Sequence, residues 1–309
     1  MIALLITIIG LCLFEIVCGI DNAVINANIL KTVQKKQRKF FLTWGLFIAV
    51  FIVRGVFPFL IVWLANSSLN LQEVFTAFFT DNEVVISSFQ KSKPMLLLAG
   101  GSYLFLIFLS WFFLEEKKYA LRIERFVYKY NVWFYAWASL FTTTIVFFSI
   151  KTDPILALGA TIGISFFFLV DGFKQNAEKV ERELISKKTK LSNWSKIFYL
   201  EVLDASFSID GVIGAFAFTT AVPLILIGNG LGAVIVRKFT MKAMRRIAKY
   251  TLLKNGAMYS IGFLGLIMLF ESFGLAVPFF LAPAVTFLMF SIFLFLSKKR
   301  LIKKGTCSN

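Results

Sequence analysis

Oxygen-bearing side chains recur at the same spacing in two apolar stretches of the chain. Each stretch holds a carboxylate, five further residues and then an aspartate beside a small or amide residue. An ionised carboxylate costs roughly 2.5–3.5 kcal/mol at the centre of a membrane helix, so several of them require a compensating partner. The chain has no His, and carboxylate, amide and hydroxyl oxygens suit hard cations such as Mn²⁺, Ca²⁺ or Mg²⁺. We therefore predict a metal site formed by Glu15, Asp21, Asn22, Asp204, Ser208 and Asp210.

The helical positions of these acids decide whether they can meet. In the second stretch, Asp204 and Gly211 are seven residues apart and so share one face of a helix. Asp210 is six residues from Asp204 and lies off that face. Asp21 is likewise six residues from Glu15 and lies off the face of Glu15. Glycines beside the two aspartates would permit local unwinding, which would join the acids and expose backbone carbonyls as ligands. We therefore expect a partly unwound segment in each helix.

A second pair of matched positions follows the acidic stretches. Gly45 stands nine residues before Arg54, and Gly228 stands nine residues before Arg237. Two matched anchors in the same order predict an internal repeat, with one copy at residues 1–64 and the other at residues 197–240. The arginines also offer a structural alternative to a metal site, because the acids can be paired with them or be protonated.

The composition indicates which elements position these side chains. Of the 309 residues, 58% are hydrophobic and only 16% are charged. A soluble domain usually has about 25% charged residues and cannot hide this much apolar surface, whereas a spanning helix needs about 20 apolar residues. We therefore predict one all-α domain over residues 1–309, a polytopic transmembrane helical bundle. Its nine expected spans are Ile2–Leu30, Phe40–Leu64, Pro94–Leu114, Val132–Ile150, Pro154–Phe173, Ile197–Thr219, Pro223–Val236, Asn255–Leu275 and Val277–Leu296.

The distribution of charge orients these spans. Lys and Arg total 33 against 17 Asp and Glu, a net charge of +16. The basic residues gather in alternate connections, among them 115–131, 174–196 and 237–254, which is the positive-inside pattern of membrane proteins and argues against nucleic-acid binding. We therefore expect these connections and the C-terminus in the cytoplasm, and the N-terminus outside. The copies begin five spans apart, so they are expected to form inverted repeats, as in secondary transporters.

The sequence also resembles the TerC family of integral membrane proteins, in particular its longer, DUF475-like branch. The resemblance rests on Phe14–Ile25, Leu200–Phe218 and Gly256–Gly262, in the same order and spacing over most of the chain. It implies a protein of bacterial-type cytoplasmic (inner) membranes, associated with manganese export and tellurium resistance. Lys254 departs from the family pattern, which has an acidic residue there. The acidic positions of the family map onto Glu15, Asp21, Asn22, Asp204 and Asp210.

Three functions fit these observations. We expect first a transporter of divalent cations, not an enzyme, with Mn²⁺ favoured over Ca²⁺ as the transported ion and no permanently bound cofactor. Export against a membrane potential costs about 2.3 kcal/mol per charge and 100 mV, which predicts proton antiport. The alternatives are a membrane scaffold of a metal or tellurite stress-response complex, and an intramembrane aspartyl protease with Asp21 and Asp210 as its dyad. The expected partners are the lipid bilayer, the metal ion, and a second copy or stress-response proteins.

Overall fold

The computed structural model consists of helices joined by short connections. It describes residues 2–30, 33–45, 47–56, 60, 63, 70, 72, 83–116, 121–185, 192–242 and 250–306. Within the helices, the side chains at 20–25, 27–28, 49–51, 53, 83–89, 177–185, 203, 206–207, 239–242 and 303–306 are not described. The described residues contain no strand, so the prediction of an all-α fold is confirmed.

The helices follow the apolar runs of the sequence. In chain order, the described elements are α1 (Ile2–Leu30), α2 (Lys35–Phe40), the π-helical segments η1 (Phe41–Gly45) and η2 (Ile48–Val56), α5 (Glu83–Leu114), α6 (Arg122–Lys129), η3 (Asn131–Trp133), α7 (Phe134–Thr152), α8 (Pro154–Ile185), α9 (Asn193–Ala215), α10 (Val222–Lys242), α12 (Leu253–Ser272) and α13 (Leu281–Thr306).

Six helical stretches of the described residues are long and apolar enough to cross a membrane. α9 is not among them, because Glu201, Asp204 and Asp210 all fall within it. The six stretches coincide with six of the predicted spans: Ile2–Gly19, Gln90–Leu114, Asn131–Thr152, Pro154–Asn176, Leu253–Ser272 and Leu281–Ile302. The chain is therefore an integral, polytopic membrane protein that contacts the lipid bilayer, and the total of nine spans stays a prediction.

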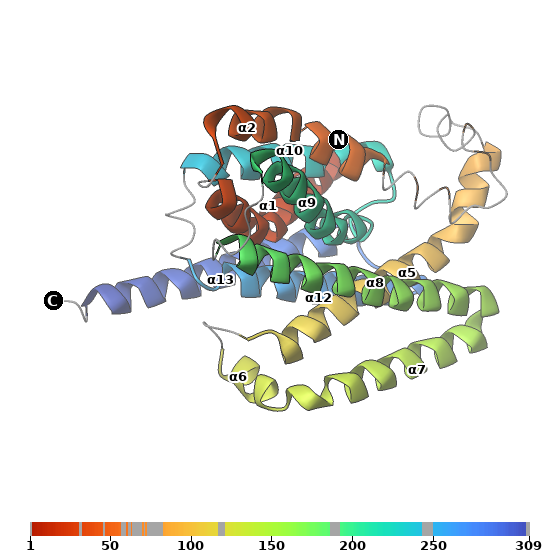
Figure 1. Ribbon diagram of the computed structural model, residues 1–309. Helices are drawn as coiled ribbons and strands as arrows, with labels where there is room; N and C mark the ends of the chain where they lie inside the picture. The colour runs from red at the N-terminus through yellow and green to blue at the C-terminus, as the bar shows by residue number, and fades with distance from the viewer. Residues whose placement is uncertain are drawn as a thin grey trace.

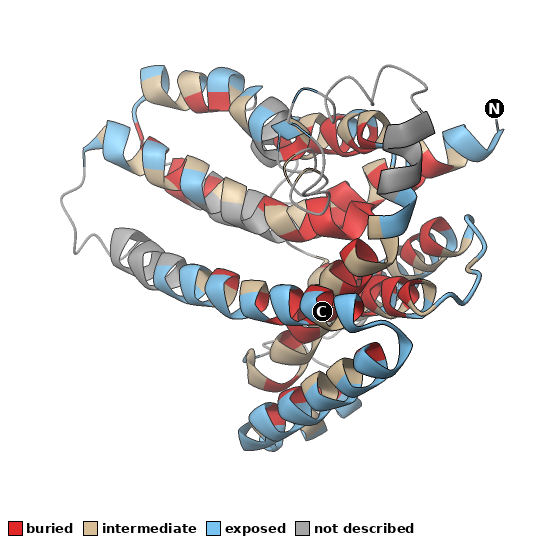
Figure 2. Cartoon of the chain, turned by 90° about the vertical axis from the view of Figure 1, so that its right-hand side faces the viewer, coloured by how far each residue is buried: buried red, intermediate tan, exposed pale blue. Residues whose placement is uncertain are grey.

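The helices pack as two adjoining groups (Figure 1). In one group, α1 packs against α10 and α9, and η2 packs against α10. In the other, α5 lies between α8 and α12, while α7 lies on the outer side of α8. Contacts of α1 with α12 and α13 join the groups. Figure 2 shows that the inward faces are buried and that the outer faces are exposed.

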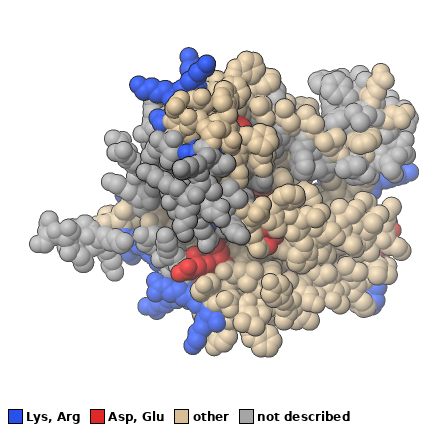
Figure 3. Space-filling model, in the orientation of Figure 1, with Lys and Arg blue, Asp and Glu red and all other residues tan. Residues whose placement is uncertain are grey.

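Large apolar side chains cover the outer faces. Phe147 on α7, Leu169 on α8 and Phe295 on α13 are all more than half exposed. In Figure 3, most of the described surface is uncharged, and its Lys and Arg side chains gather mainly on the left, where the C-terminus lies in Figure 1. An extended apolar surface of this kind would be a liability in water and suits contact with lipid.

Helices extend into the connections that the charge pattern identified. α8 continues to Ile185, inside the predicted connection 174–196, and α10 continues to Lys242, inside 237–254. The connection 115–131 contains α6. Lys, Arg and Glu are good helix formers, so a charged run marks the end of an apolar span without ending the helix. The cytoplasmic location of these connections stays a prediction.

The two acidic helices are not unwound. α1 is continuous over its 29 residues and α9 over its 23, so the expectation of partly unwound segments is wrong. The glycines permit close packing instead. A Cβ atom at Gly214 would lie 2.5 Å from the ring of Phe14, and one at Gly19 would lie 3.3 Å from the side chain of Val236.

Candidate functional site

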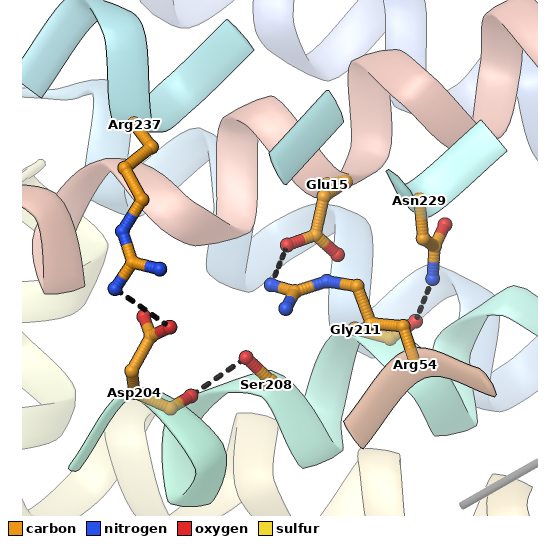
Figure 4. A network of polar contacts seen from close by, with 7 residues as sticks. All are labelled: Glu15, Arg54, Asp204, Ser208, Gly211, Asn229 and Arg237. Carbon is orange, nitrogen blue, oxygen red and sulfur yellow. Dashed lines mark hydrogen bonds and ion pairs between the residues drawn. The ribbon is translucent and has the colours of Figure 1, made fainter. Parts of the chain in front are cut away.

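Glu15 forms the centre of a polar network inside the bundle (Figure 4). It lies on α1, is 3% exposed, and accepts a hydrogen bond at Oε1 from the guanidinium of Arg54, which is 4% exposed. Arg54 lies on η2, a nine-residue π-helix, and π-helical turns are rare and frequently found at functional sites. Burying both charges is costly and is tolerated only because they are paired. Separation of the pair would leave each charge buried without this partner, which costs free energy.

Arg237 faces two further carboxylates at longer distances. Its Nη2 atom lies 3.6 Å from Oδ2 of Asp204 and 3.8 Å from Oε1 of Glu201. Both separations exceed the usual N–H···O distance of about 2.7–3.2 Å, so the attraction is electrostatic. The guanidinium also lies over the ring of Phe41, 4.0 Å from its centroid, which is a cation–π contact. Beside it, the hydroxyl of Ser208 donates to the backbone carbonyl of Asp204 at 2.6 Å.

These ion pairs follow the internal repeat of the sequence. Glu15 matches Asp204 and Arg54 matches Arg237, and each acid is paired with the arginine of its own copy. The segments also pack crosswise, since α1 lies against α10 and α9 lies against η2. The structural alternative, in which arginines neutralise the acids, therefore describes Glu15 and Asp204 in this structure. The opposite direction of the two copies stays a prediction.

Two buried oxygen atoms beside Gly211 have no donor among the described residues. One is Oε2 of Glu15, which would lie only 2.8 Å from a Cβ atom at Gly211. The other is Oδ1 of Asn229, whose Nδ2 donates to the carbonyl of Gly211 at 3.2 Å. A buried polar group without a partner costs about 1–3 kcal/mol. These oxygens therefore offer lone pairs to a ligand, and oxygen ligands are what hard cations bind.

Glycines let other segments approach the acids closely. A Cβ atom at Gly232 would lie 2.6 Å from Cβ of Glu15, and one at Gly45 would overlap the carboxylate of Glu201. Gly232 lies on α10 and Gly45 on η1, so in each case a segment of one copy contacts an acid of the other. The match that identified Gly45 as a repeat anchor thus has a packing reason, because only glycine fits there.

The structure brings together part of the predicted metal site. Glu15, Asp204 and Ser208 belong to the network of Figure 4. Asp210 lies off that face, because α9 stays helical. Among the described side chains, no group of three or more Cys, Asp or Glu is arranged to hold a metal ion. Two predicted ligands fall outside the described side chains, namely Asp21 and Asn22.

Asp210 has a separate set of partners. The hydroxyl of Tyr103 on α5 donates to its Oδ1 at 2.6 Å, and Nζ of Lys174 on α8 donates to its Oδ2 at 2.6 Å. Asp210 is 7% exposed and borders a cavity of about 340 Å³ that Lys174 also lines. Both carboxylate oxygens are thus held in the present structure.

Sequence reasoning missed several members of these two clusters. Asn229, Tyr103 and Lys174 are single polar residues in or at the end of apolar runs, and their only signal was that a polar group at membrane depth requires a partner. Lys254, the departure from the family pattern, has its ammonium 2.6 Å from Oε1 of Glu115. Both residues line the cavity that reaches Asp210.

Comparison with known proteins sets these residues among related sequences. A family profile described as "Protein of unknown function (DUF475)" matches residues 20–301. The chain is also 28% identical over 142 residues to the "Uncharacterized membrane protein YceF" of Bacillus subtilis (strain 168), a match that covers 45% of this chain and 52% of that protein. The chain thus spans about half the length of this curated relative. No solved structure matches the chain.

Proposed function

The chain belongs to the DUF475 family, and on that premise we propose that it is a membrane transporter of divalent cations, with Mn²⁺ as the favoured cargo and Ca²⁺ as the second candidate. Six helical stretches of spanning length and the buried acids among them support this proposal. The resemblance to the TerC family adds manganese export and an association with tellurium resistance. The relative from B. subtilis is named only as a membrane protein, so it supports the membrane setting alone.

The observation that carries the proposal is the pair of unpartnered oxygens beside Gly211. Oε2 of Glu15 and Oδ1 of Asn229 are buried acceptors without a donor among the described residues. A hard cation would satisfy Oε2 of Glu15, and Asn229 would join its coordination if the amide turned its Oδ1, which points away from Glu15 in Figure 4, toward the ion. Water or further oxygens would complete the coordination. The absence of a side chain at Gly211 lets the carboxylate of Glu15 approach α9 closely. A cation bound here would be held by residues of α1 and α10 beside α9.

The surrounding network holds more acidic than basic groups. Its acids are Glu15, Glu201 and Asp204, and its bases are Arg54 and Arg237, so three carboxyl groups face two guanidinium groups. Carboxylates in a low-dielectric interior attract cations strongly. Arg237 lies 3.6 and 3.8 Å from its acids and does not bond them directly, so an arriving cation would displace it first.

In this proposal the two guanidinium groups act as internal counter-ions. While no cation is bound, they neutralise the acids, so that bare carboxylates are not exposed to an apolar environment. When a cation binds, it takes over the carboxylates and the guanidinium groups move away. The predicted inverted repeat supplies the motion, because rocking of one copy against the other would open the site alternately to the two sides.

Direction and coupling follow from the resemblance and from the energy of the ion. Export of a divalent cation against a potential of 100 mV costs about 2.3 kcal/mol for each of its charges. A coupled inward flow of protons would supply that energy. We therefore propose cation export in exchange for protons.

One observation favours a second candidate, a membrane scaffold without transport. Glu15 and Arg54 are bonded directly, and a protein that carries no ion would need such pairs for folding alone. In the protease alternative, Asp210 of the predicted dyad is bonded to Tyr103 and Lys174. The other member, Asp21, lies outside the described side chains.

Mn²⁺ flux into proteoliposomes tests the proposal. Wild-type protein would be compared with Asp204→Asn, and with Glu116→Gln as a control, because Glu116 is exposed. We expect flux that depends on a proton gradient, that is lost in Asp204→Asn and that is unchanged in Glu116→Gln. Flux that does not require a proton gradient would rule out proton antiport. Absence of flux from well-folded wild-type protein would rule out transport and favour the scaffold function.

A further inference from the structure

A charged cavity lies beside α9, apart from the Glu15 network. It has a volume of about 340 Å³ and is lined by residues of α1, α5, α8, α9 and α12. Its wall carries three carboxylates and two ammonium groups, those of Glu115, Asp171, Asp210, Lys174 and Lys254. This volume is in the range of pockets that bind small ligands, and it is ample for a hydrated ion.

The charged groups of the wall differ in how firmly they are held. Lys254 and Glu115 are 2.6 Å apart and about 40% exposed, so they form a pair near solvent. The carboxylate of Asp171 accepts a hydrogen bond from Gln175 at 2.7 Å. The pair of Lys174 and Asp210 is much less exposed, at 14% and 10% of their side chains. The cavity thus passes from an exposed ion pair to a buried one.

Tyr103 orients the buried carboxylate. Its hydroxyl holds Oδ1 of Asp210 at 2.6 Å, and Tyr103 itself is 1% exposed. The other oxygen, Oδ2, is the one that Lys174 contacts. A lysine ammonium is a compact point charge on a flexible stem of four carbons. Lys174 can therefore swing away from Oδ2 while Tyr103 keeps the carboxylate in place.

We propose that this cavity is the vestibule in which the transported cation first binds, at Oδ2 of Asp210, and that the ammonium of Lys174 holds the place of the cation until it arrives. The inference rests on the proposed transport function and adds to it a first binding site with Lys174 as a competitor. Asp210 and Gly211 are consecutive residues of α9. Oδ2 of Asp210 and the oxygens beside Gly211 are thus two positions on the same short stretch of α9.

Binding of Mn²⁺ to the purified full chain tests the competitor role. The electron paramagnetic resonance signal of free Mn²⁺ would be titrated with wild type, Lys174→Gln and Lys174→Arg. Lys93→Gln is the matched control, because Lys93 forms an equally short pair, 2.7 Å from Glu271, outside the cavity. Removing a positive charge from the cation position would tighten binding about tenfold or more. We expect this for Lys174→Gln, with Lys174→Arg and Lys93→Gln close to wild type.

A second measurement leaves Lys174 in place, in case its variants do not fold. Cys18 also lines the cavity, so its thiol reports on access. In a Cys12→Ser, Cys307→Ser background, we expect Cys18 to react with a cationic methanethiosulfonate reagent and Mn²⁺ to slow that reaction. A reaction rate that Mn²⁺ does not change would overturn the vestibule.

The outcomes separate this inference from the function on which it rests. Unchanged or weaker binding in Lys174→Gln, together with loss of binding in Asp204→Asn, would overturn the role of Lys174 and leave the transport proposal standing. Absence of Mn²⁺ binding in wild type and in every variant would overturn both.

Discussion

Glu15 and Arg54, 39 residues apart in the chain, form a buried ion pair between α1 and η2. Asp204 and Arg237, at the matching positions of the second copy, form a looser pair at 3.6 Å. Glu15 and Asp204 are thus each paired with the arginine of their own copy. This arrangement explains how α9 keeps several carboxylates inside a membrane protein, and it makes the arginines the groups with which a cation must compete.

Arg54→Met tests the energetic role of the first pair. Removal of one partner leaves the carboxylate of Glu15 buried and unpaired, which typically costs about 3–5 kcal/mol. We expect a loss of this size in the free energy of unfolding, measured by denaturant titration in detergent. Lys93→Met breaks a more exposed pair with Glu271 and should cost at most about 1 kcal/mol. Equal effects of the two changes would show that the Glu15 pair is not special.

Gly211→Ala tests the close approach at the proposed cation position. The added Cβ would lie 2.8 Å from Oε2 of Glu15, so the carboxylate would have to move away. Overpacking of this kind typically costs about 1–3 kcal/mol, and we expect Mn²⁺ flux to fall with it. Gly172→Ala is the matched control on α8, because nothing lies within 4 Å of its added Cβ. Normal flux in Gly211→Ala would argue against a site at this glycine.

Glu124 anchors α6 to α12. It is fully buried, and its Oε2 accepts hydrogen bonds from the backbone N–H of Leu121 and from the side chain of Asn255, both at 2.7 Å. Glu124→Ala would leave these donors unpaired, at about 1–3 kcal/mol. A thermal-unfolding scan should show this loss, whereas Glu116→Ala at an exposed position should not. An unchanged unfolding temperature in Glu124→Ala would mean that other contacts hold α6 in place.

Single cysteines test the predicted orientation of α8. The background would lack Cys12, Cys18 and Cys307. Thr152→Cys would place a thiol just before the start of α8, and Ser192→Cys would place one after its end. The positive-inside pattern predicts that position 192 is labelled only from the cytoplasm and position 152 only from outside. Labelling of both from the same side would refute the predicted topology.

The sequence allowed the fold to be predicted further than the site. Apolar runs specify spanning helices, because length and hydropathy are properties of the sequence itself. The matched anchors also singled out Arg54 and Arg237, and the structure shows that each pairs with an acid of its own copy. The π-helical form of η2, which brings Arg54 to Glu15, had no such signal.

Contacts between distant segments were beyond prediction from one sequence. Asp210 was assigned to the same site as Asp204, although their six-residue spacing separates them on a regular helix. That assignment required unwinding, whereas α9 stays helical, with Gly211 and Gly214 packed closely against α1. Lys174, the partner of Asp210, lies 36 residues away along the chain, and no local pattern links the two.

The central claim is that Glu15 serves transport and not folding alone, and a charge-neutral double substitution tests it most directly. Glu15→Leu with Arg54→Met removes both charges of the pair, and replacement of a buried ion pair by hydrophobic residues of similar volume often leaves stability nearly unchanged. Mn²⁺ flux would be measured in proteoliposomes that contain equal amounts of folded wild type and double variant. The account predicts a stable double variant whose flux falls to the background of empty liposomes. A stable double variant with wild-type flux would contradict it and would make the pair a structural element only.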